Sequence, residues 1–301
     1  MSWRVTLHCS RAEAEALPES EELFPFAEAP PVIVADEPDP HAPDDWRIHA
    51  YFADQPSRDD LAALGTLAAG AAPEVDHLGE DDWVTMSQTG LEPIRAGRFF
   101  VHTPMHRDAI PEGATAYEID AGLAFGTGHH DTTAGCLAAL DRLERSGKSF
   151  VNIADIGTGT GLLAFAALAL WPQARGIATD IDPVSIEVTA DNARINHVPI
   201  GHGEGELLLA VADGMEHEML VARAPFDLLI ANILAGPLVE LAPSFAASVA
   251  PGATVILAGL LDTQANAVIT AYEQQGMAVI ERGAGEWCVL VLEAPQQGDR
   301  H

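Results

Sequence analysis

Beyond residue 130 the chain alternates apolar runs of strand length with longer segments of helical periodicity. The strand-like runs are residues 149–156, 176–180, 206–211, 228–230 and 254–258, and the helical segments are residues 132–145, 162–171, 183–196 and 237–249. Apolar strands separated by helices are typical of a parallel sheet that is covered on both faces. Two further apolar runs, 277–282 and 286–293, flank a Gly-Ala-Gly turn and predict a hairpin. We therefore expect an α/β domain whose mostly parallel sheet ends in an antiparallel hairpin.

The first 80 residues show shorter elements in a different order. Their patterning predicts strands at residues 3–9, 31–35, 46–52 and 74–78 and helices at residues 11–17 and 58–69. Ser57 precedes the second helix and Asp60 follows three residues later, which is close to the pattern of a capping box. The order strand, helix, strand, strand, helix, strand is typical of a small α+β sandwich of the ferredoxin-like type.

Residues 81–120 are interrupted by glycine and proline and contain two short strand-like runs, 98–101 and 115–119. This segment is expected to be a connector that leans on the larger domain. The predicted organisation is therefore a small domain at 1–80, a connector at 81–120 and a large domain at 121–301.

The chain is strongly acidic, with 45 Asp and Glu against 15 Lys and Arg and a formal net charge of -30 over 301 residues. A field of this sign repels polyanions and attracts basic partners over roughly a Debye length, so we expect no direct nucleic-acid partner. The excess is marked in residues 1–70, where 14 acidic residues stand against four arginines. Acidity of this kind also serves solubility alone, and both interpretations stay open at this point.

Cysteine usage and hydropathy indicate the compartment. The three cysteines, Cys9, Cys136 and Cys288, are widely spaced, so neither a disulfide framework nor a cysteine-based metal site is predicted. Residues 1–17 lack the apolar core of a signal peptide, and the apolar runs of the large domain are too short or too interrupted for a membrane span. We expect a cytoplasmic, monomeric protein with no membrane partner.

A glycine-rich turn, residues 155–161 (Asp-Ile-Gly-Thr-Gly-Thr-Gly), lies between an apolar strand and the next helix. Glycines let the backbone turn sharply and approach a ligand closely, since no Cβ intrudes. A dinucleotide-binding turn needs its third glycine one residue later, where Leu162 stands, so the spacing favours a nucleoside over a pyrophosphate. Gly157 and Gly159 are the candidate binding positions, and a purely structural turn is the alternative.

Two acidic residues end the next two strands. Asp180 stands 23 residues beyond Gly157, where a carboxylate can accept hydrogen bonds from the hydroxyls of a ribose. Asp182 follows closely and is expected to cap the helix that begins at Pro183. Asp213 ends the third strand and is a candidate for contact with an adenine edge, although an ordinary turn residue fits the same position.

Asn232 ends the apolar run 228–231. Ligands of open α/β sheets bind outside the carboxyl ends of the strands, so its side chain is expected in the same crevice as Gly157 and Asp180. An asparagine carbonyl there accepts a hydrogen bond from an incoming amine and aims its lone pair at a methyl donor. Asn232 is therefore the candidate catalytic residue, and the alternative is a helix cap before Leu234.

The loop at residues 125–133 (Phe-Gly-Thr-Gly-His-His-Asp-Thr-Thr) precedes the first helix of the large domain. Its glycines and paired threonines suit a flexible lid whose backbone and hydroxyls contact a polar ligand. His129 and His130 are sequence neighbours without further ligands at metal-binding spacing, so no metal site is predicted. The sequence also lacks a Gly-x-Ser-x-Gly elbow, a Walker loop and a paired His-Glu zinc helix, which excludes the usual hydrolase and kinase chemistry.

Together these segments resemble the ribosomal protein L-11 methyltransferase family (PrmA-type). The resemblance extends from about residue 81 to residue 293, and its most specific pieces are residues 124–133, 155–161, 179–183, 231–238 and 286–288. It implies a Rossmann-like class I methyltransferase fold preceded by a small ferredoxin-like substrate-recognition domain. The implied cofactor is S-adenosyl-L-methionine, and the implied reaction is methyl transfer to lysine side chains and the terminal amine of ribosomal protein L-11.

Residue by residue, the resemblance implies that this cofactor is held by matching positions of the chain. Asn232 begins the segment Asn-Ile-Leu-Ala, which looks like the family's segment beside the transferred methyl, and is assigned the catalytic role. The cofactor-binding residues are assigned as Phe125, Gly126, Thr133, Gly157, Gly159, Asp180, Asp213 and Asn232. The chain departs from the family in loop 128–133, where Gly-His-His-Asp-Thr-Thr replaces Gly-Thr-His-Pro-Thr-Thr, and at Thr158 and Thr160, where Cys and Ser are usual.

Two alternatives to this function stay open. A nucleic-acid amine methyltransferase commonly follows the strand-end asparagine with prolines and an aromatic ring that stacks on a flipped base, whereas Ile233 and Leu234 follow it here. A non-catalytic protein that binds S-adenosylmethionine would share the same pocket, and the presence of Asn232 disfavours it.

Overall fold

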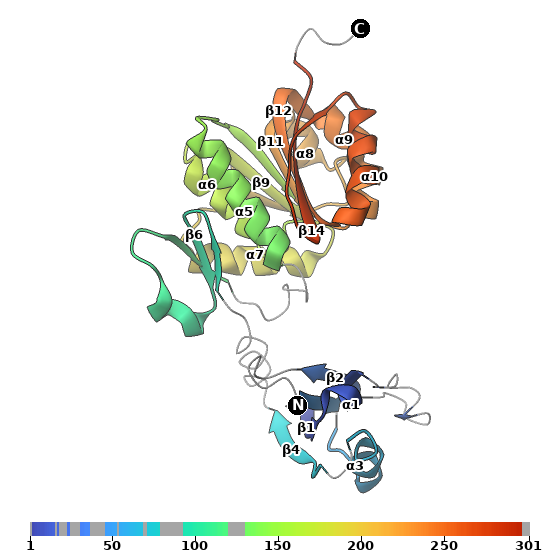
Figure 1. Cartoon of the computed structure of the whole chain (residues 1–301). Helices are drawn as coiled ribbons and strands as arrows, with labels where there is room; N and C mark the ends of the chain where they lie inside the picture. The colour runs from blue at the N-terminus through green and yellow to red at the C-terminus, as the bar shows by residue number, and fades with distance from the viewer. Residues whose placement is uncertain are drawn as a thin grey trace. The chain divides into compact units, whose positions relative to one another are not determined.

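A computed structural model of the chain describes residues 2–15, 17, 23–24, 31–36, 46–52, 54–68, 71–78, 93–119 and 130–296. The chain comprises two compact units, Met1–Ser87 and Gln88–His301 (Figure 1). Among the described residues, every helix is too short or too polar to cross a lipid bilayer.

The small unit is built on a four-stranded antiparallel sheet with the strand order β2-β3-β1-β4. Its elements in chain order are β1 (Ser2–Cys9), α1 (Arg11–Glu15), β2 (Val32–Asp36), β3 (Trp46–Phe52), α3 (Arg58–Leu64) and β4 (Glu74–Leu78). Both the element order and the strand order are those of a ferredoxin-like sandwich, as predicted. Alternate residues of the central strands, Val5 and Leu7 of β1 and Ile48 and Ala50 of β3, form its core with Leu64 of α3.

Ser57 and Asp60 begin α3 as the predicted capping box. The Ser57 hydroxyl accepts a hydrogen bond from the Asp60 amide at 3.1 Å, and the Asp60 carboxylate accepts one from the Ser57 amide at 2.8 Å. A cap of this kind stabilises a helix by roughly 1 kcal/mol. The helix ends at Leu64, earlier than the predicted residue 69, because Gly65 follows and glycine is a poor helix former.

The large unit is built on a seven-stranded sheet with the strand order β10-β9-β8-β11-β12-β14-β13. In chain order the strands are β8 (Asn152–Ile156), β9 (Arg175–Asp180), β10 (Leu207–Val211), β11 (Phe226–Asn232), β12 (Val249–Leu261), β13 (Ala278–Arg282) and β14 (Trp287–Glu293). The strands from β10 to β12 run parallel, and β14 runs antiparallel to both β12 and β13. The predicted mostly parallel sheet with an antiparallel hairpin is confirmed.

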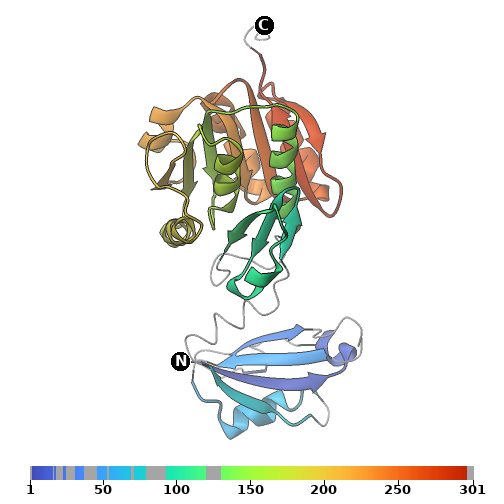
Figure 2. The same ribbon diagram turned by 90° about the vertical axis from the view of Figure 1, so that its left-hand side faces the viewer.

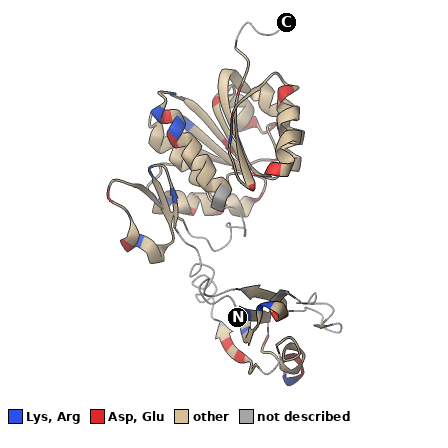
Figure 3. Ribbon diagram, in the orientation of Figure 1, with Lys and Arg blue, Asp and Glu red and all other residues tan. Residues whose placement is uncertain are grey.

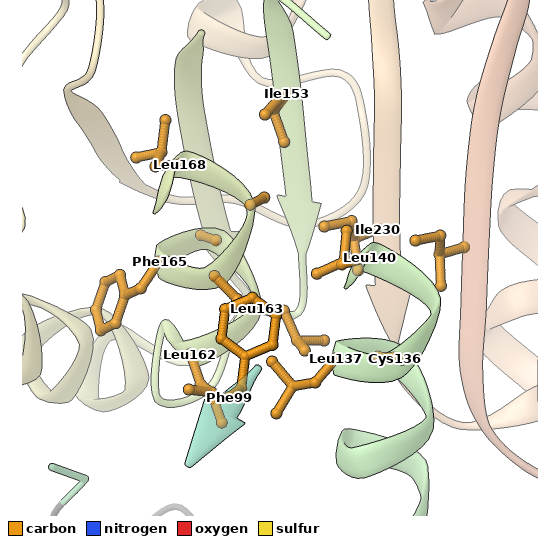
Figure 4. Packing of buried hydrophobic residues seen from close by; sticks show 14 of the residues in the cluster. Phe99, Cys136, Leu137, Leu140, Ile153, Leu162, Leu163, Phe165, Leu168 and Ile230 are labelled. Carbon is orange, nitrogen blue, oxygen red and sulfur yellow. The ribbon is translucent and has the colours of Figure 1, made fainter. Parts of the chain in front are cut away.

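Helices cover both faces of this sheet. One face carries α5 (His130–Arg145), α6 (Leu162–Leu170) and α7 (Pro183–Ile195), and the other carries α8 (Glu218–Arg223), α9 (Ala235–Ser248) and α10 (Asp262–Glu273). Figure 1 shows α5 and α6 on the side opposite α9 and α10. In the first layer Leu137 and Leu140 of α5 pack with Leu163 of α6 against Ile153 and Ile230 of the sheet (Figure 4).

Helix α6 is apolar on every side, and all of its residues from Leu162 to Leu168 are buried. A helix of this composition is stable only inside a protein, and α6 packs beside α5 and against the strands β8 and β9. Burying one leucine or phenylalanine side chain contributes roughly 1.5–3 kcal/mol. The packing of α6 therefore anchors the glycine turn that immediately precedes it.

A second, three-stranded sheet packs beside α5 in the large unit (Figures 1 and 2). Its elements are β5 (Ile94–Ala96), β6 (Phe99–His102), the 3-10 helix η1 (Pro104–Ala109) and β7 (Thr115–Glu118). The predicted strands 98–101 and 115–119 correspond to β6 and β7, whereas β5 is too short to show a period. Arg98 ties the sheet to α5 by donating to Asp141 at 2.6 Å and to Glu144, and the Tyr117 hydroxyl donates to the Phe165 carbonyl at 3.0 Å.

Candidate functional site

Three adjacent strands of the large sheet end at the same level. In the parallel register Ile156 of β8 lies opposite Thr179 of β9 and Ala231 of β11. Neighbouring strands lie about 4.8 Å apart, so the residues that follow these three are close together. Those residues are Gly157, Asp180 and Asn232. The structure therefore brings three predicted positions to one carboxyl edge of the sheet, where ligands of open α/β sheets bind.

Backbone hydrogen bonds fold the glycine turn onto the end of β9. The amides of Gly157 and Thr158 donate to the Thr179 carbonyl at 2.8 and 2.9 Å. The amide of Gly159 donates to Oδ2 of Asp180 at 2.9 Å. The turn and the carboxylate are thereby held together as one rigid element.

The three glycines of this turn are required for different structural reasons. Gly157, Gly159 and Gly161 all have positive φ, at 72°, 57° and 84°, a region that disfavours other residues. A Cβ at Gly157 would overlap Cγ2 of Ile233, and a Cβ at Gly161 would overlap Phe165. A Cβ at Gly159 would meet none of the described atoms within 4 Å. Packing thus requires two of the glycines, and the open position for a close ligand is Gly159.

Asp180 is partly exposed at the end of β9, and its carboxylate is oriented from two sides. Oδ2 accepts from the Gly159 amide, and Oδ1 accepts from the Asp182 amide at 3.1 Å. Each oxygen retains a lone pair for an external donor such as a ribose hydroxyl. Asp182 itself caps α7 by accepting from the Val184 amide at 2.9 Å, as predicted.

Asn232 ends β11 with its side chain directed at α5. Its Nδ2 donates to the hydroxyl of Thr133 at 3.5 Å, while its Oδ1 is shielded from water and has no hydrogen-bond partner among the described residues. An unpaired buried acceptor costs roughly 1–3 kcal/mol. The N-cap of α9 is Leu234, so Asn232 is not the helix cap that was the alternative reading. The free Oδ1 is instead available to a donor that enters the site.

The structure places the other predicted residues as follows. Thr133 is buried in the first turns of α5 and reaches Asn232. Asp213 lies two residues beyond Val211, which pairs with Asp180, so it belongs to the same edge, and its side chain is exposed. Phe125 and Gly126 lie outside the described residues.

Asp155 is an important residue that the sequence interpretation passed over. Its side chain is 1% exposed, and its carboxylate accepts from the Thr158 hydroxyl at 2.7 Å and from the Ala164 amide at 3.2 Å. It therefore joins the glycine turn to α6. Burial raises the pKa of this carboxyl from 3.8 to about 7. The signal in the sequence was an acidic residue inside an otherwise apolar strand.

Helix α7 holds the outer side of the same turn. The Thr189 hydroxyl donates to the Gly159 carbonyl at 2.9 Å, and Nδ2 of Asn192 donates to the Thr160 carbonyl at 3.0 Å. These contacts span about thirty residues of sequence, so no local pattern indicates them. They hold the carbonyl groups of Gly159 and Thr160, while the amide of Gly159 donates to Asp180.

The site can therefore hold a nucleoside and present an acceptor to a second reactant. The open backbone at Gly159 and the oriented carboxylate of Asp180 suit a ligand with free ribose hydroxyls. The unpartnered oxygen of Asn232 suits a group that donates a hydrogen bond beside it. Among the described residues, no cluster of three His, Cys, Asp or Glu side chains is placed to bind a metal ion.

Comparison with known sequences identifies the family. The sequence profile described as ribosomal protein L11 methyltransferase (PrmA) matches residues 5–295. The ribosomal protein L11 methyltransferase of Brucella suis is 44% identical over 232 residues, which cover 77% of this chain and 79% of that protein. The protein of the same name from Rhodopseudomonas palustris is 44% identical over 253 residues, which cover 82% of this chain and 83% of that protein.

A solved structure agrees with this assignment. The crystal structure of ribosomal protein L11 methylase from Lactobacillus delbrueckii subsp. bulgaricus matches with a TM-score of 0.55 and 26% sequence identity, covering 68% of this chain and 99% of that chain. The family profile extends over both units of the present chain. The chain belongs to the ribosomal protein L11 methyltransferase (PrmA) family of S-adenosylmethionine-dependent enzymes.

Proposed function

We propose that this protein transfers methyl groups from S-adenosylmethionine to lysine side chains and the terminal amine of ribosomal protein L11. The substrate is suggested by the names of the relatives that are 44% identical to this chain over 232 and 253 residues. The chemistry rests on one observation, the buried and unpartnered Oδ1 of Asn232 at the edge that also carries Gly159 and Asp180.

On this proposal the cofactor lies across the carboxyl edge of the sheet. Its ribose hydroxyls donate to Asp180, its nucleoside passes over the open backbone at Gly159, and Asp213 faces the adenine edge. The remaining cofactor contacts are assigned to Phe125, Gly126, Thr133, Gly157 and Asn232. When bound, S-adenosylmethionine supplies an electrophilic methyl group on a sulfonium.

Asn232 has the chemistry needed to orient the acceptor amine. A lysine amine has an ordinary pKa of about 10.4, so its neutral form must be selected before it can attack. Oδ1 of Asn232 accepts a hydrogen bond from the amine and directs its lone pair, and it does so without a negative charge that would favour the ammonium form. The proton that the amine loses passes to water. Holding the amine in line at near contact distance supplies most of the acceleration.

Thr133 supports this orientation of the amide. Its hydroxyl lies 3.5 Å from Nδ2 of Asn232 and so occupies the donor side of the side chain. The acceptor side then faces the space where the amine is expected. This arrangement explains why a buried oxygen is left without a partner in the absence of substrate.

The acidic small unit is proposed as the region that recognises the basic substrate. Residues 1–70 contain 14 acidic residues and four arginines, and β4 adds Glu74 and Asp76 (red in Figure 3). Opposite charges raise the rate of encounter and make it sensitive to salt. A monomeric enzyme acting in the cytoplasm, where ribosomal proteins are made, is consistent with this role.

Transfer of a labelled methyl group to purified ribosomal proteins and, in a separate reaction, to ribosomal RNA tests the proposed function. We expect label in L11 with the wild-type enzyme, little with Asn232→Ala, and wild-type labelling with Asn266→Ala, which changes an exposed asparagine of α10. Label in ribosomal RNA would support a nucleic-acid methyltransferase instead. Cofactor binding without transfer to any acceptor would support a non-catalytic factor.

A further inference from the structure

A cavity of about 510 Å³ lies at the opposite, amino edge of the central sheet. Its walls include Asn152 at the start of β8, Arg175 at the start of β9 and Arg223 at the end of α8, together with Gln173 and Glu204. Asn152 is five residues before Gly157, a distance of roughly 16 Å along an extended strand. The cavity is therefore separate from the site assigned to S-adenosylmethionine.

The two arginines of this cavity have no ion-pair partner among the described residues. Nη1 and Nη2 of Arg223 are shielded from water and have no hydrogen-bond acceptor among the described residues. No described carboxylate forms an ion pair with either Arg175 or Arg223. Burial, and then the like charge of Arg175, lower the pKa of Arg223. Two guanidinium groups thus line the same cavity, and no described carboxylate pairs with either of them.

This arrangement is unusual within the large unit. Its other described basic side chains form ion pairs with carboxylates, apart from Arg95, which lies over the Phe100 ring. The paired residues are Arg98, Arg107, Arg142, Arg145, Lys148, Arg194 and Arg282. In a chain with 45 acidic and 15 basic residues, carboxylates are abundant. Two adjacent arginines without a partner among the described carboxylates therefore point to an acceptor from outside this part of the chain.

The nearest part of the backbone is held firmly and does not supply that acceptor. Nδ2 of Asn152 donates to the carbonyls of Arg223 and Pro225 at 2.6 and 2.9 Å. The Asp227 carboxylate accepts from the amides of Val151 and Asn152 at 2.8 and 2.9 Å. These bonds fix the main chain around Arg223 and involve none of its guanidinium nitrogens.

We propose that this cavity binds a phosphate group between the guanidinium groups of Arg175 and Arg223. A phosphate dianion matches two neighbouring positive charges, and guanidinium groups bind phosphate oxygens through paired hydrogen bonds. Gln173 offers a further amide donor at the wall. The exposed Glu204 repels a free anion but accepts a hydroxyl, so a phosphate monoester that carries hydroxyls fits better than inorganic phosphate.

Calorimetric titration of the full chain at low ionic strength tests this proposal. The ligands are ribose 5-phosphate, inorganic phosphate and, as a control without phosphate, ribose. We expect saturable binding of ribose 5-phosphate at millimolar concentration or below, weaker binding of inorganic phosphate, and none of ribose. Tighter binding of inorganic phosphate would identify the free ion as the ligand and still support the site.

Variants of the two arginines connect the binding to the cavity. Arg175→Gln and Arg223→Gln should each weaken phosphate binding about tenfold or more, since each removes one charged donor. Arg194→Gln, which changes an exposed arginine of α7, should leave it unchanged. Arg175 is exposed, so its variant is expected to fold even if Arg223→Gln does not. Absence of binding by either phosphate ligand, or binding unaffected by Arg175→Gln, would overturn the proposal.

Discussion

The two edges of the central sheet carry opposite chemistry on the same strands. At the carboxyl edge β8 and β9 lead into Gly157 and Asp180, where the carboxylate of Asp180 offers oxygen acceptors. At the amino edge the same strands begin with Asn152 and Arg175, and Arg223 lies beside them in a cavity. One sheet thus provides an acceptor-rich site and a cation-rich site at its opposite ends.

The edges also differ in how completely their polar groups are paired. At the carboxyl edge hydrogen bonds from Gly159, Thr158 and α7 hold the turn, while Oδ1 of Asn232 and the hydroxyl of Thr179 have no partner among the described residues. At the amino edge the backbone is bonded, and Nη1 and Nη2 of Arg223 have no acceptor in the described part of the chain. The unpaired groups are thus mainly oxygens at one edge and guanidinium nitrogens at the other. This difference predicts that changes at one edge leave the other edge's ligand unaffected.

The largest expected effect concerns Asp155, which lies beneath the glycine turn. Its pKa is about 7 in the folded protein, against an ordinary value of 3.8. Between these values the folded state holds a proton that the unfolded state has lost, so the free energy of unfolding falls as pH rises. The decline is at most about 1.4 kcal/mol per pH unit, or roughly 4 kcal/mol in total. Asp155→Asn should remove this contribution.

Urea unfolding of both proteins between pH 4 and 8 measures this contribution. The difference between wild type and Asp155→Asn should change steadily up to pH 7 and become constant above it. Asp191→Asn, at an exposed position of α7, serves as the matched control and should follow wild type. A pH-independent difference for Asp155→Asn would contradict the assigned ionisation.

Next in size is the contrast between two glycines of one turn. Gly157→Ala should destabilise the protein by roughly 3 kcal/mol, because its Cβ overlaps Ile233 and its φ is positive. The Cβ added by Gly159→Ala meets no described atom, so this variant should lose only about 1–2 kcal/mol of stability through backbone strain. It should nevertheless weaken cofactor binding. Thermal unfolding and cofactor titration of both variants separate the two roles. Equal loss of stability would show that Gly159 is not an open position.

Asn232→Ala should lower turnover about 100-fold, equivalent to roughly 2.7 kcal/mol in the barrier, with a smaller change in cofactor affinity. The reason is that Oδ1 orients the amine rather than holding the nucleoside. Single-turnover methylation of L11 gives the rate, and calorimetry gives the affinity. Unchanged turnover would remove Asn232 from the mechanism.

Asp180→Ala should weaken S-adenosylmethionine binding by roughly 2 kcal/mol, about 30-fold, because the ribose hydroxyls lose a charged acceptor. Asp213→Ala is the comparison, and because this residue is exposed to solvent its substitution should have a smaller effect. Both affinities are measured by calorimetric titration. Wild-type affinity in Asp180→Ala would refute its placement at the ribose.

The smallest expected effect tests the independence of the amino edge. Asn152→Ala removes the two bonds to the carbonyls of Arg223 and Pro225 and should destabilise the protein by about 1–2 kcal/mol. Affinity for S-adenosylmethionine should stay as in wild type, because the change lies at the far end of β8. A parallel loss of cofactor affinity would show that the two edges are coupled.

Much of this fold could be predicted from local patterning. Apolar periodicity located the strands of the large sheet, the closing hairpin and the helices α5, α6, α7 and α9, whereas no residue range was predicted for α8 or α10. The capping residues Ser57 and Asp182 marked the starts of α3 and α7. The elements β5 and α8 are too short for hydrophobic periodicity to be recognised in the sequence. Strand ends also identified Gly157, Asp180 and Asn232 as neighbours, because parallel strands deliver their carboxyl ends to one edge.

By itself the sequence determined which residues stand at strand ends, because the hydrophobic periods of two for strands and 3.6 for helices can be recognised from neighbouring residues. Tertiary structure alone decided which of those residues are free to bind. Ile233 closes the space at Gly157 and leaves Gly159 open, Thr133 meets Asn232 across 99 residues of chain, and two distant arginines come to share a cavity. Such contacts depend on how the helices pack on the sheet. Packing brings together residues that are far apart in the sequence, and local sequence patterns contain no information about such pairs.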